Sequence, residues 1–489
     1  MFRRTALTAA LAALTVVGMS ATASAAVPLT KVLEDPFTNT DSQHQTAVEP
    51  DTFVSGSTIV AVSQIGRYFN GGASGTGFAT SQNGGTNWTS GALPGLTANQ
   101  TPSGPYARTT DPVIAYDDAH SVWLAQSLAL NSSPSGLALV VNRSTDGGLT
   151  WSGPVVSAAA GAGQDFDKNW IVCDNTAASP FYGRCYQTWD DFGNGNRILN
   201  NTSTDGGLTW GPALATANNA TGLGGQPVVR PNGTVIVPAA NAFETAIIAF
   251  RSTDGGGSWS SSVNVSGVPS HTVAGNLRSG PLPSAEIDGA GKAYVVWQDC
   301  RFRKACKSND IVMSTSPDGV TWSAVTRIPL DSVNSGVDHF IPGVGVDVAT
   351  SGASAKLALT YYFYRVARCG TKRAPCQLEV GHSQSSDGGT TWSTPTDVAG
   401  PFPVTWAADT SQGRMVGDYI STSWMGGRAW PAVALASAPS GTVFDEDLFV
   451  PTGGLAAASG GSVSTASGDH PVAGAASDHA APRSPIRTR

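Results

Sequence analysis

Short apolar runs recur along the chain, and turns rich in Gly, Asp, Asn and Ser separate them. In one unit the four successive runs cover residues 112–116, 121–125, 137–141 and 153–157. Runs of about five apolar residues bounded by turn residues are typical of β-strands. First strands of the same kind return at 170–173, 228–230, 284–287 and 343–346. The pattern therefore predicts an all-β protein of repeated four-stranded antiparallel units, which is the construction of a β-propeller.

An eight-residue phrase, here called the box phrase, follows the third run of each unit. It reads STDGGLTW at 144–151 and 203–210, STDGGGSW at 252–259, SSDGGTTW at 385–392, SQNGGTNW at 81–88 and TSPDGVTW at 315–322. The Asp and Ser side chains bond to backbone N–H groups in a tight turn, and Gly supplies positive φ. The closing Trp pins the turn against neighbouring strands. The repetition therefore predicts a structural role for these Asp residues and no catalytic one.

The number of units depends on the C-terminal part of the chain. Six box phrases indicate six blades, but strand-like runs at 417–421 and 429–433 begin a further unit. Residues 437–444 (SAPSGTVF) read as a degenerate box phrase, and residues 29–33 can supply the last strand of that unit. Closing the ring with strands from both ends of the chain removes exposed sheet edges. We therefore expect one propeller domain over residues 26–454 with seven blades, six being the alternative.

The two ends of the chain lack this pattern. Arg3 and Arg4 precede a short apolar run that ends in Ala-Ser-Ala at 23–25, which is typical of a secretory signal peptide over residues 1–25. A membrane anchor is the competing interpretation, but the apolar run is short. Residues 455–489 are rich in Ala, Gly, Ser and Pro, and we expect them to be disordered. These features predict a secreted protein.

Composition and cysteine spacing agree with export. The six Cys fall into local pairs, 173 with 185, 300 with 306 and 369 with 376, which predicts three disulfides rather than a zinc site. Charged residues make up only 13% of the 489 residues, and the net charge of −7 argues against a nucleic-acid partner. We expect a monomer without a membrane anchor in its mature form, and a carbohydrate as its substrate or ligand.

Charged and aromatic residues concentrate in connections that a propeller places on one face. These are the connections into each first strand and those from the second strand to the third, and we call their common face the start face. We expect it to carry Arg67, Asp111, Asp167, Arg301, Arg303, Asp338, His339, Arg365 and Tyr419. Loops that present polar groups on a rigid scaffold are frequent sites of function. The convergence of these groups predicts a ligand site at the propeller axis.

The box phrases resemble those of the sialidase-like, or BNR-repeat, propellers, and the resemblance covers nearly the whole mature chain. It implies an exo-acting glycosidase, possibly an exo-alpha-sialidase, in which an Arg triad binds a carboxylate and a Tyr is the nucleophile. On this basis the substrate-binding candidates are Arg67, Arg301, Arg303 and Arg365, with Asp338 and His339, and the catalytic candidates are Asp111, Asp167 and Tyr419. The Phe/Tyr-Arg-Ile-Pro phrase of family sialidases is absent near the N-terminus, and Glu286 is a candidate for the Glu that assists the Tyr.

Other chemistries stay open at this point. Two carboxylates across the axis suffice for ordinary glycoside hydrolysis. His339 with Tyr362 or Tyr419 suits a polysaccharide lyase. A non-catalytic propeller that binds glycan or protein is a further alternative, because a fold does not fix a function. No cofactor is expected, and calcium on Asp carboxylates is the open alternative.

Overall fold

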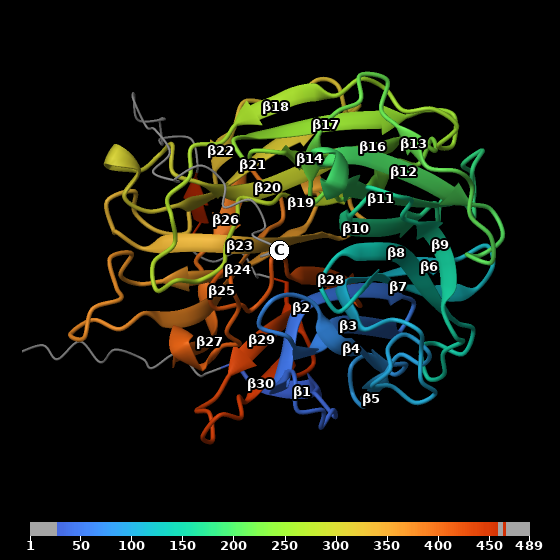
Figure 1. Ribbon diagram of the computed structural model, residues 1–489. Coiled ribbons are helices and arrows are strands. Elements are labelled where there is room, and N and C mark those ends of the chain that lie inside the picture. Colours follow the sequence, from blue (N-terminus) through green and yellow to red (C-terminus); the bar gives the residue numbers. More distant parts are fainter. Residues whose placement is uncertain (1–26, 458–462, 466–489) are drawn as a thin grey trace, which may run out of the picture.

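The computed structural model describes residues 27–457 and 463–465. The described chain is built of β-strands, with four short 3-10 segments: η1 (Phe192–Asn194), η2 (Lys304–Cys306), η3 (Gly352–Ser354) and η4 (Val404–Trp406). The expected signal peptide and most of the expected tail lie outside the described residues. Figure 1 shows the sheets following one another around the molecule in chain order. The all-β fold of antiparallel four-stranded sheets that the apolar pattern predicts is therefore confirmed.

Each sheet is a meander whose first strand is the innermost. The first three are β2 (Gln43–Ser55), β3 (Thr58–Arg67), β4 (Ala73–Ser81) and β5 (Thr89–Ala92); β6 (Arg108–Asp117), β7 (Val122–Leu130), β8 (Gly136–Ser144) and β9 (Val155–Ala159); and β10 (Phe166–Cys173), β11 (Cys185–Asp191), β12 (Arg197–Ser203) and β13 (Leu214–Ala215). The next three are β14 (Gly222–Leu223) and β15 (Val228–Val229) with β16 (Val235–Asn241), β17 (Ala246–Ser252) and β18 (Val263–Gly267); β19 (Ser284–Ile287), β20 (Ala293–Asp299), β21 (Asp310–Ser316) and β22 (Thr326–Arg327); and β23 (Asp338–Val346), β24 (Leu357–Tyr364), β25 (Gln377–Ser385) and β27 (Thr396–Pro403).

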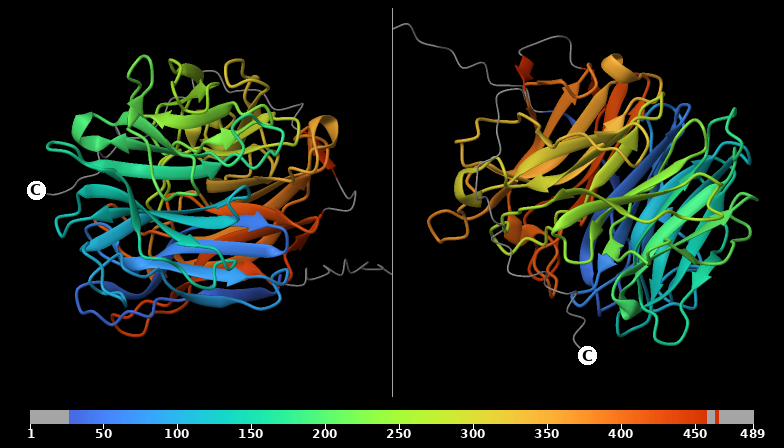
Figure 2. Two further views of the ribbon diagram at one scale, coloured as in Figure 1. Left: turned by 90° about the vertical axis from the view of Figure 1, so that its right-hand side faces the viewer. Right: turned by 90° about the horizontal axis from the view of Figure 1, so that it is seen from above.

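The two ends of the domain meet in one sheet. It contains β28 (Ser421–Met425), β29 (Arg428–Ala436) and β30 (Glu446–Pro451), and β1 (Leu29–Leu33) pairs antiparallel with β30. The strand expected at residues 29–33 is therefore present, in the expected place. β30 also pairs with β2, so strands from the two ends of the domain lie side by side in Figures 1 and 2. Two short additions are β31 (Leu455–Ala456) on β29, and β32 (Val463–Thr465) on β26 (Thr391–Ser393).

Hydrogen bonds join the innermost strands of neighbouring sheets. They run from Ile114 N–H to Asp51 Oδ2 (2.9 Å), Lys168 N–H to Asp111 Oδ2 (3.0 Å), Ala285 N–H to Gln226 Oε1 (2.9 Å), Val344 N–H to Ser284 Oγ (3.1 Å) and Thr422 Oγ1 to Gly343 O (3.0 Å), with Thr52 Oγ1 beside Ser421 Oγ (2.9 Å). These side chains satisfy strand edges that would otherwise be unpaired in the middle of the molecule.

The box phrase forms a closed turn. In the second sheet Asp146 Oδ1 accepts hydrogen bonds from the backbone N–H of Leu149 (3.1 Å) and Thr150 (2.9 Å). Ser144 Oγ donates to Asp146 Oδ1 (2.8 Å) and accepts from Gly148 N–H (2.9 Å). The Asp and Ser side chains are thus used within the turn, as the sequence predicts for a structural element.

The second Gly of the phrase also lies against the preceding sheet. A Cβ on Gly148 would come within 3.1 Å of Val60 on β3, and one on Gly85 would overlap the indole ring of Trp430 on β29. Both glycines have positive φ, 83° and 78°. Glycine is therefore required twice, by the backbone conformation and by the close approach of the neighbouring sheet.

Apolar clusters fill the space between neighbouring sheets, and three disulfides supplement them. One cluster joins Val113 and Leu124 of the second sheet to Ile171 of the third. The disulfides are Cys173–Cys185, Cys300–Cys306 and Cys369–Cys376, as predicted. None of the helical segments among the described residues is long and apolar enough to span a membrane.

Candidate active site

The same irregularity recurs near the beginning of four innermost strands. The pairing register shifts by one residue at Glu49 in β2, Asp111 in β6, Lys168 in β10 and Ile341 in β23. Each of these residues has positive φ, between 47° and 62°. A β-bulge re-aims a side chain and interrupts pairing, and bulges are frequent next to active sites. The bulges at Glu49, Asp111 and Lys168 place two carboxylates and one ammonium group in one cluster on the start face.

Asp418 is the centre of this cluster. Arg278 Nε donates a 2.6 Å hydrogen bond to Asp418 Oδ1, and Lys168 Nζ and a second Arg278 nitrogen bind Oδ2. Burial disfavours the charged carboxylate, but the charges and hydrogen bonds of Arg278 and Lys168 outweigh it and lower the pKa of Asp418 below its usual range. The two cations therefore favour the ionised form of Asp418.

Glu49 lies behind Asp418 and has the opposite tendency. It is fully buried, it accepts hydrogen bonds from Gln64 Nε2 and from the Asp418 N–H (3.2 Å), and Lys168 Nζ lies 3.7 Å from its Oε1. Burial raises its pKa to about 7, and the charge of Lys168 offsets only part of that effect. Since no solvent reaches Glu49, it supports the cluster from below.

Asp111 and Asp167 join the same cluster from the second and third sheets. Asp111 accepts hydrogen bonds from Thr110 Oγ1 and the Lys168 N–H, each 3.0 Å, and its Oδ1 lies 3.8 Å from Lys168 Nζ. Asp167 accepts a 3.1 Å hydrogen bond from the Lys168 N–H and pairs across the sheet with Asp190. Burial and the charge of Asp167 raise the pKa of Asp190. The two Asp residues expected to be catalytic thus lie around one lysine.

Glu244 is a further acid that the sequence analysis missed. It lies in the connection between β16 and β17, is partly exposed, and has positive φ (53°). Burial and the charge of Asp418 raise its pKa, and Lys168 and Arg278 act in the opposite direction. Connections between second and third strands were assigned to the start face, so the same rule applied to residues 241–246 would have found it.

Arg67 and Tyr419 lie in the cluster, and each donates a hydrogen bond to a backbone carbonyl, while Arg67 also donates to Gln64 Oε1 (3.2 Å). Arg67 is 3% exposed and donates to Gly72 O (2.7 Å). Burial and the nearby charge of Arg278 lower its pKa to about 10. The Tyr419 hydroxyl donates to Pro112 O (2.9 Å), its ring packs edge-on against Trp170 at 5.0 Å, and burial raises its pKa well above the usual value.

The other expected arginines bind carboxylates of their own. Arg301 binds Asp299, Arg303 binds both Asp310 and Asp331, and Arg365 binds Glu379 and Asp397. Among the described residues, no hydrogen bond or ion pair connects Arg301, Arg303 or Arg365 with Asp418. The structure therefore brings together Arg67, Asp111, Asp167 and Tyr419, and it adds Glu49, Lys168, Glu244, Arg278 and Asp418.

Asp338 and His339 are buried in the sixth sheet. Asn309 donates its N–H (2.6 Å) and its side-chain amide (3.1 Å) to Asp338 Oδ1, and burial raises the pKa of Asp338 to about 8. The His339 ring lies between Tyr361 and Phe363, and burial lowers its pKa. Asp310, Asp331 and His339 are close enough to share a metal ion, but Arg303 already binds both of these carboxylates.

Taken together, the cluster can perform acid–base chemistry. The charges of Lys168 and Arg278 act on both acids. Asp418 has a lowered pKa, whereas Glu244 has a raised pKa. A pair of titratable groups whose environments push their pKa values apart is the usual basis for separate acid and base roles. Arg278, with a side chain 21% exposed, marks the side from which solvent reaches the cluster.

Comparisons with known proteins concern the repeats and the fold. The BNR repeat-like domain family matches residues 181–359. No curated protein matches the chain.

Similar solved structures include a protein of unknown function from Dyadobacter fermentans, which is 17% identical with a TM-score of 0.45 and covers 73% of this chain and 99% of its own. An alpha-L-arabinofuranosidase from Fusarium graminearum is 13% identical with a TM-score of 0.45 and covers 73% and 98%. The Hadza microbial sialidase Hz136 is 13% identical with a TM-score of 0.41 and covers 83% and 65%. The match over residues 181–359 confirms the resemblance to the BNR-repeat group that the box phrases indicated.

Proposed function

We propose that this protein is an exported glycoside hydrolase that removes terminal sugars from glycans, with its active site in the start-face cluster around Asp418. The observation that carries the proposal is the opposed acidity of two carboxyl groups in one cluster. Asp418 has a lowered pKa, and Glu244 has a raised pKa and is partly exposed. Glycosidases need one carboxylic acid that protonates the leaving oxygen and one carboxylate that stays charged.

Glu244 is the proposed general acid. It keeps its proton at a higher pH than an isolated Glu, which suits donation of that proton to the glycosidic oxygen. Asp418 supplies the negative charge that faces the developing oxocarbenium ion, and Asp111 or Asp167 is the carboxylate placed to activate water. Lys168 and Arg278 keep Asp418 ionised and fixed in position.

The rim of the cluster supports a sugar ligand. Phe243, next to the proposed acid, is 66% exposed, and Phe69 in the connection between β3 and β4 is 54% exposed. A flat aromatic ring complements the apolar face of a pyranose or furanose, so these two rings offer surfaces on which a sugar can stack. The two rings belong to connections that reach the start face.

The substrate proposed here is a neutral terminal sugar. An exo-alpha-sialidase needs three arginines around one substrate carboxylate, as Arg67, Arg301 or Arg303, and Arg365 were expected to provide. Arg67 donates to the backbone, and Arg301, Arg303 and Arg365 each bind carboxylates of the protein. The guanidinium group of Arg278 is already hydrogen-bonded to Asp418. A sialoside is therefore the contrasting substrate in the test.

We further propose that the propeller has seven blades and is closed by β1 in the sheet of β28, β29 and β30. The hydrogen bonds between innermost strands support this, since β28 contacts both β23 and β2. Export is supported by the three disulfides, because such bonds persist in oxidising compartments.

The test is a release assay on aryl glycosides and oligosaccharides of neutral sugars, with a sialoside alongside. We expect the wild-type chain to release a neutral sugar, and Asp418→Asn to lower kcat/KM at least about 100-fold. The control is Asp397→Asn, whose side chain is 61% exposed on the sixth sheet, and it should retain activity. Binding without release would identify a non-catalytic propeller, an unsaturated product would identify a lyase, and release of sialic acid alone would overturn the neutral-sugar assignment.

A further inference from the structure

One cavity of the propeller lies away from the start-face cluster. It has a volume of about 590 Å³ and is lined by the second halves of the innermost strands and by the turns that follow them. Since each box phrase follows a strand that runs parallel to the innermost one, these turns and the box phrases share one face, here called the box face. The volume is within the range of about 300–1,000 Å³ that is usual for small-molecule sites.

An aromatic contact separates the cavity from the start-face cluster. Trp170 lines the cavity, and Tyr419, on its other side, packs edge-on against it at 5.0 Å. A hollow of only about 10 Å³ remains beside Lys168 on the far side of this pair. A ligand in the cavity would therefore enter from the box face and would not reach Asp418.

The side chains around the cavity carry negative charge only. Asp51, Asp118, Glu286 and Asp288 line it, whereas no Lys or Arg is among its lining residues in the described chain. Asp288 is used by its own turn, where it accepts hydrogen bonds from the backbone N–H of Lys292 (2.9 Å) and Gly352 (2.9 Å). Asp118 accepts a hydrogen bond from the Tyr182 hydroxyl (2.7 Å). Asp51 and Glu286 remain as the two acids in the interior.

Asp51 and Glu286 differ from the acids of the start face because no cation compensates them. Asp51 is 4% exposed and accepts hydrogen bonds from the Ile114 N–H (2.9 Å), the Ser421 side chain and the Thr52 N–H, all of them from uncharged groups. Burial raises the pKa of Asp51 to about 7, and burial together with the charge of Asp51 raises the pKa of Glu286 to about 8. Two neighbouring buried acids without a compensating cation are stabilised by a ligand that brings positive charge.

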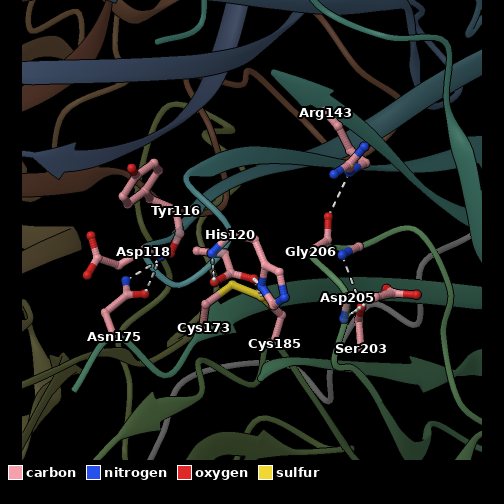
Figure 3. Close-up of a disulfide and its surroundings, with 12 residues drawn as sticks. Tyr116, Asp118, His120, Arg143, Cys173, Asn175, Cys185, Ser203, Asp205 and Gly206 are labelled. Atoms are coloured by element: carbon pink, nitrogen blue, oxygen red, sulfur yellow. Dashed lines mark hydrogen bonds and ion pairs between the residues drawn. A yellow bond between two sulfur atoms is a disulfide. The ribbon is translucent and has the colours of Figure 1, made fainter. Parts of the chain in front are cut away.

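The remaining walls combine apolar and aromatic side chains with uncharged polar ones, among them Thr52, Gln226 and Ser421. The apolar and aromatic side chains include Phe53, Tyr116, Trp170 and Val172, and an ammonium group over an aromatic face gains cation–π attraction, most strongly with Trp. A hard metal ion prefers six or more oxygen ligands, and among the described residues neither Asp51 nor Glu286 belongs to a group of three or more ligating side chains close enough to share an ion. The wall is also braced: Asn175 donates to Tyr116 O (2.8 Å) and accepts from the Asp118 N–H (2.9 Å), beside the Cys173–Cys185 disulfide (Figure 3).

We propose that the box-face cavity is a binding site for a small organic ammonium ion with an apolar or aromatic body, held by Asp51 and Glu286 and by the Trp170 ring. This site is independent of the proposed hydrolase activity, because its residues and its mouth are separate from those of the start-face cluster.

The test is isothermal titration calorimetry of the full mature chain at pH 8 with tryptamine and phenethylamine. The matched neutral ligand is tryptophol, in which a hydroxyl replaces the ammonium group, and calcium chloride alone is a third titrant. We expect both amines to bind and tryptophol to bind at least about tenfold more weakly than tryptamine. Glu286→Gln should weaken tryptamine binding at least tenfold and leave tryptophol unchanged.

Two variants locate the site. Glu34→Gln, on a side chain 62% exposed at the end of β1, and Glu244→Gln, in the start-face cluster, should bind tryptamine like the wild type. Absence of amine binding, equal affinity for tryptamine and tryptophol, or binding of calcium alone would overturn the proposal. Should Glu286→Gln unfold, Asp51→Asn gives the same comparison. An effect of Glu244→Gln as large as that of Glu286→Gln would place the amine at the start face instead.

Discussion

Two adjacent glycines of the first box phrase allow a direct test of how the ring closes. Gly84 and Gly85 both have positive φ, 70° and 78°, so replacement by Ala strains the backbone equally. A Cβ on Gly84 meets no atom within 4 Å, whereas one on Gly85 overlaps the indole ring of Trp430 on β29. The comparison of Gly85→Ala with Gly84→Ala therefore isolates the contact between the first sheet and the sheet that contains β1.

The expected magnitudes follow from these two terms. An L-residue in the left-handed region costs roughly 1–2 kcal/mol, which is the full expected effect of Gly84→Ala. Forcing a methyl group into filled space costs about 1–3 kcal/mol more. Trp430 is 2% exposed and has little room to move, so Gly85→Ala should lower the free energy of unfolding by about 2–5 kcal/mol.

The assay is urea unfolding followed by circular dichroism, with the midpoint compared at constant m-value. Replacing Trp430 by Phe removes ring atoms that the new Cβ meets, so Gly85→Ala should cost less in a Trp430→Phe background. Equal losses for Gly84→Ala and Gly85→Ala, or an unchanged loss in the Trp430→Phe background, would refute the reasoning and with it the closure of the ring through β29.

Three further predictions concern buried charge and the disulfide. Lys168→Met leaves three carboxylates without their shared cation and should cost about 3–5 kcal/mol in urea unfolding, whereas the exposed control Lys304→Met should cost almost nothing. Glu286 has a folded pKa of about 8, raised above its unfolded value, so its contribution is fully present below about pH 4.5 and is lost as pH rises to 8. Glu286→Gln should therefore stabilise the protein by about 1–2 kcal/mol at pH 8, after allowance for its partial exposure, and leave stability at pH 4 unchanged; stabilisation at both pH values would contradict this. Removing the Cys173–Cys185 bond by a double Ser replacement should lower the unfolding free energy by about 2–4 kcal/mol, and a wild-type urea midpoint would contradict it.

The repeated elements could be predicted because they depend on local sequence. Apolar runs of strand length gave β6 and β7, and the run at 29–33 gave β1, since alternation and turn residues act over a few positions. The three disulfides followed from short spacings. The turn of the box phrase followed from the preference of Asp, Ser and Gly for particular backbone geometries.

Which residues gather around Asp418 could be predicted only in part, because the grouping depends on bulges and on pairing between distant residues. Glu49 and Asp111 precede Pro, which signals a bulge within a strand, but Lys168 precedes Asn169 and has no such signal. The carboxylate that Arg365 binds, Glu379, lies on the neighbouring strand, and only the strand register shows that pairing. Glu244 could have been predicted, because it lies in a connection between a second and a third strand, and such connections were assigned to the start face.

The most direct test of the start-face site is the dependence of Glu244→Gln on the leaving group. A general acid matters most when the leaving oxygen is basic, so the variant should lose about 100-fold or more in kcat/KM on an alkyl glycoside or oligosaccharide and much less on a nitrophenyl glycoside of the same sugar. Glu34→Gln, which changes an exposed carboxyl group, should match the wild type on both substrates. Equal losses on the two substrates, or no loss on either, would contradict the assignment of Glu244 as the acid of a catalytic centre around Asp418.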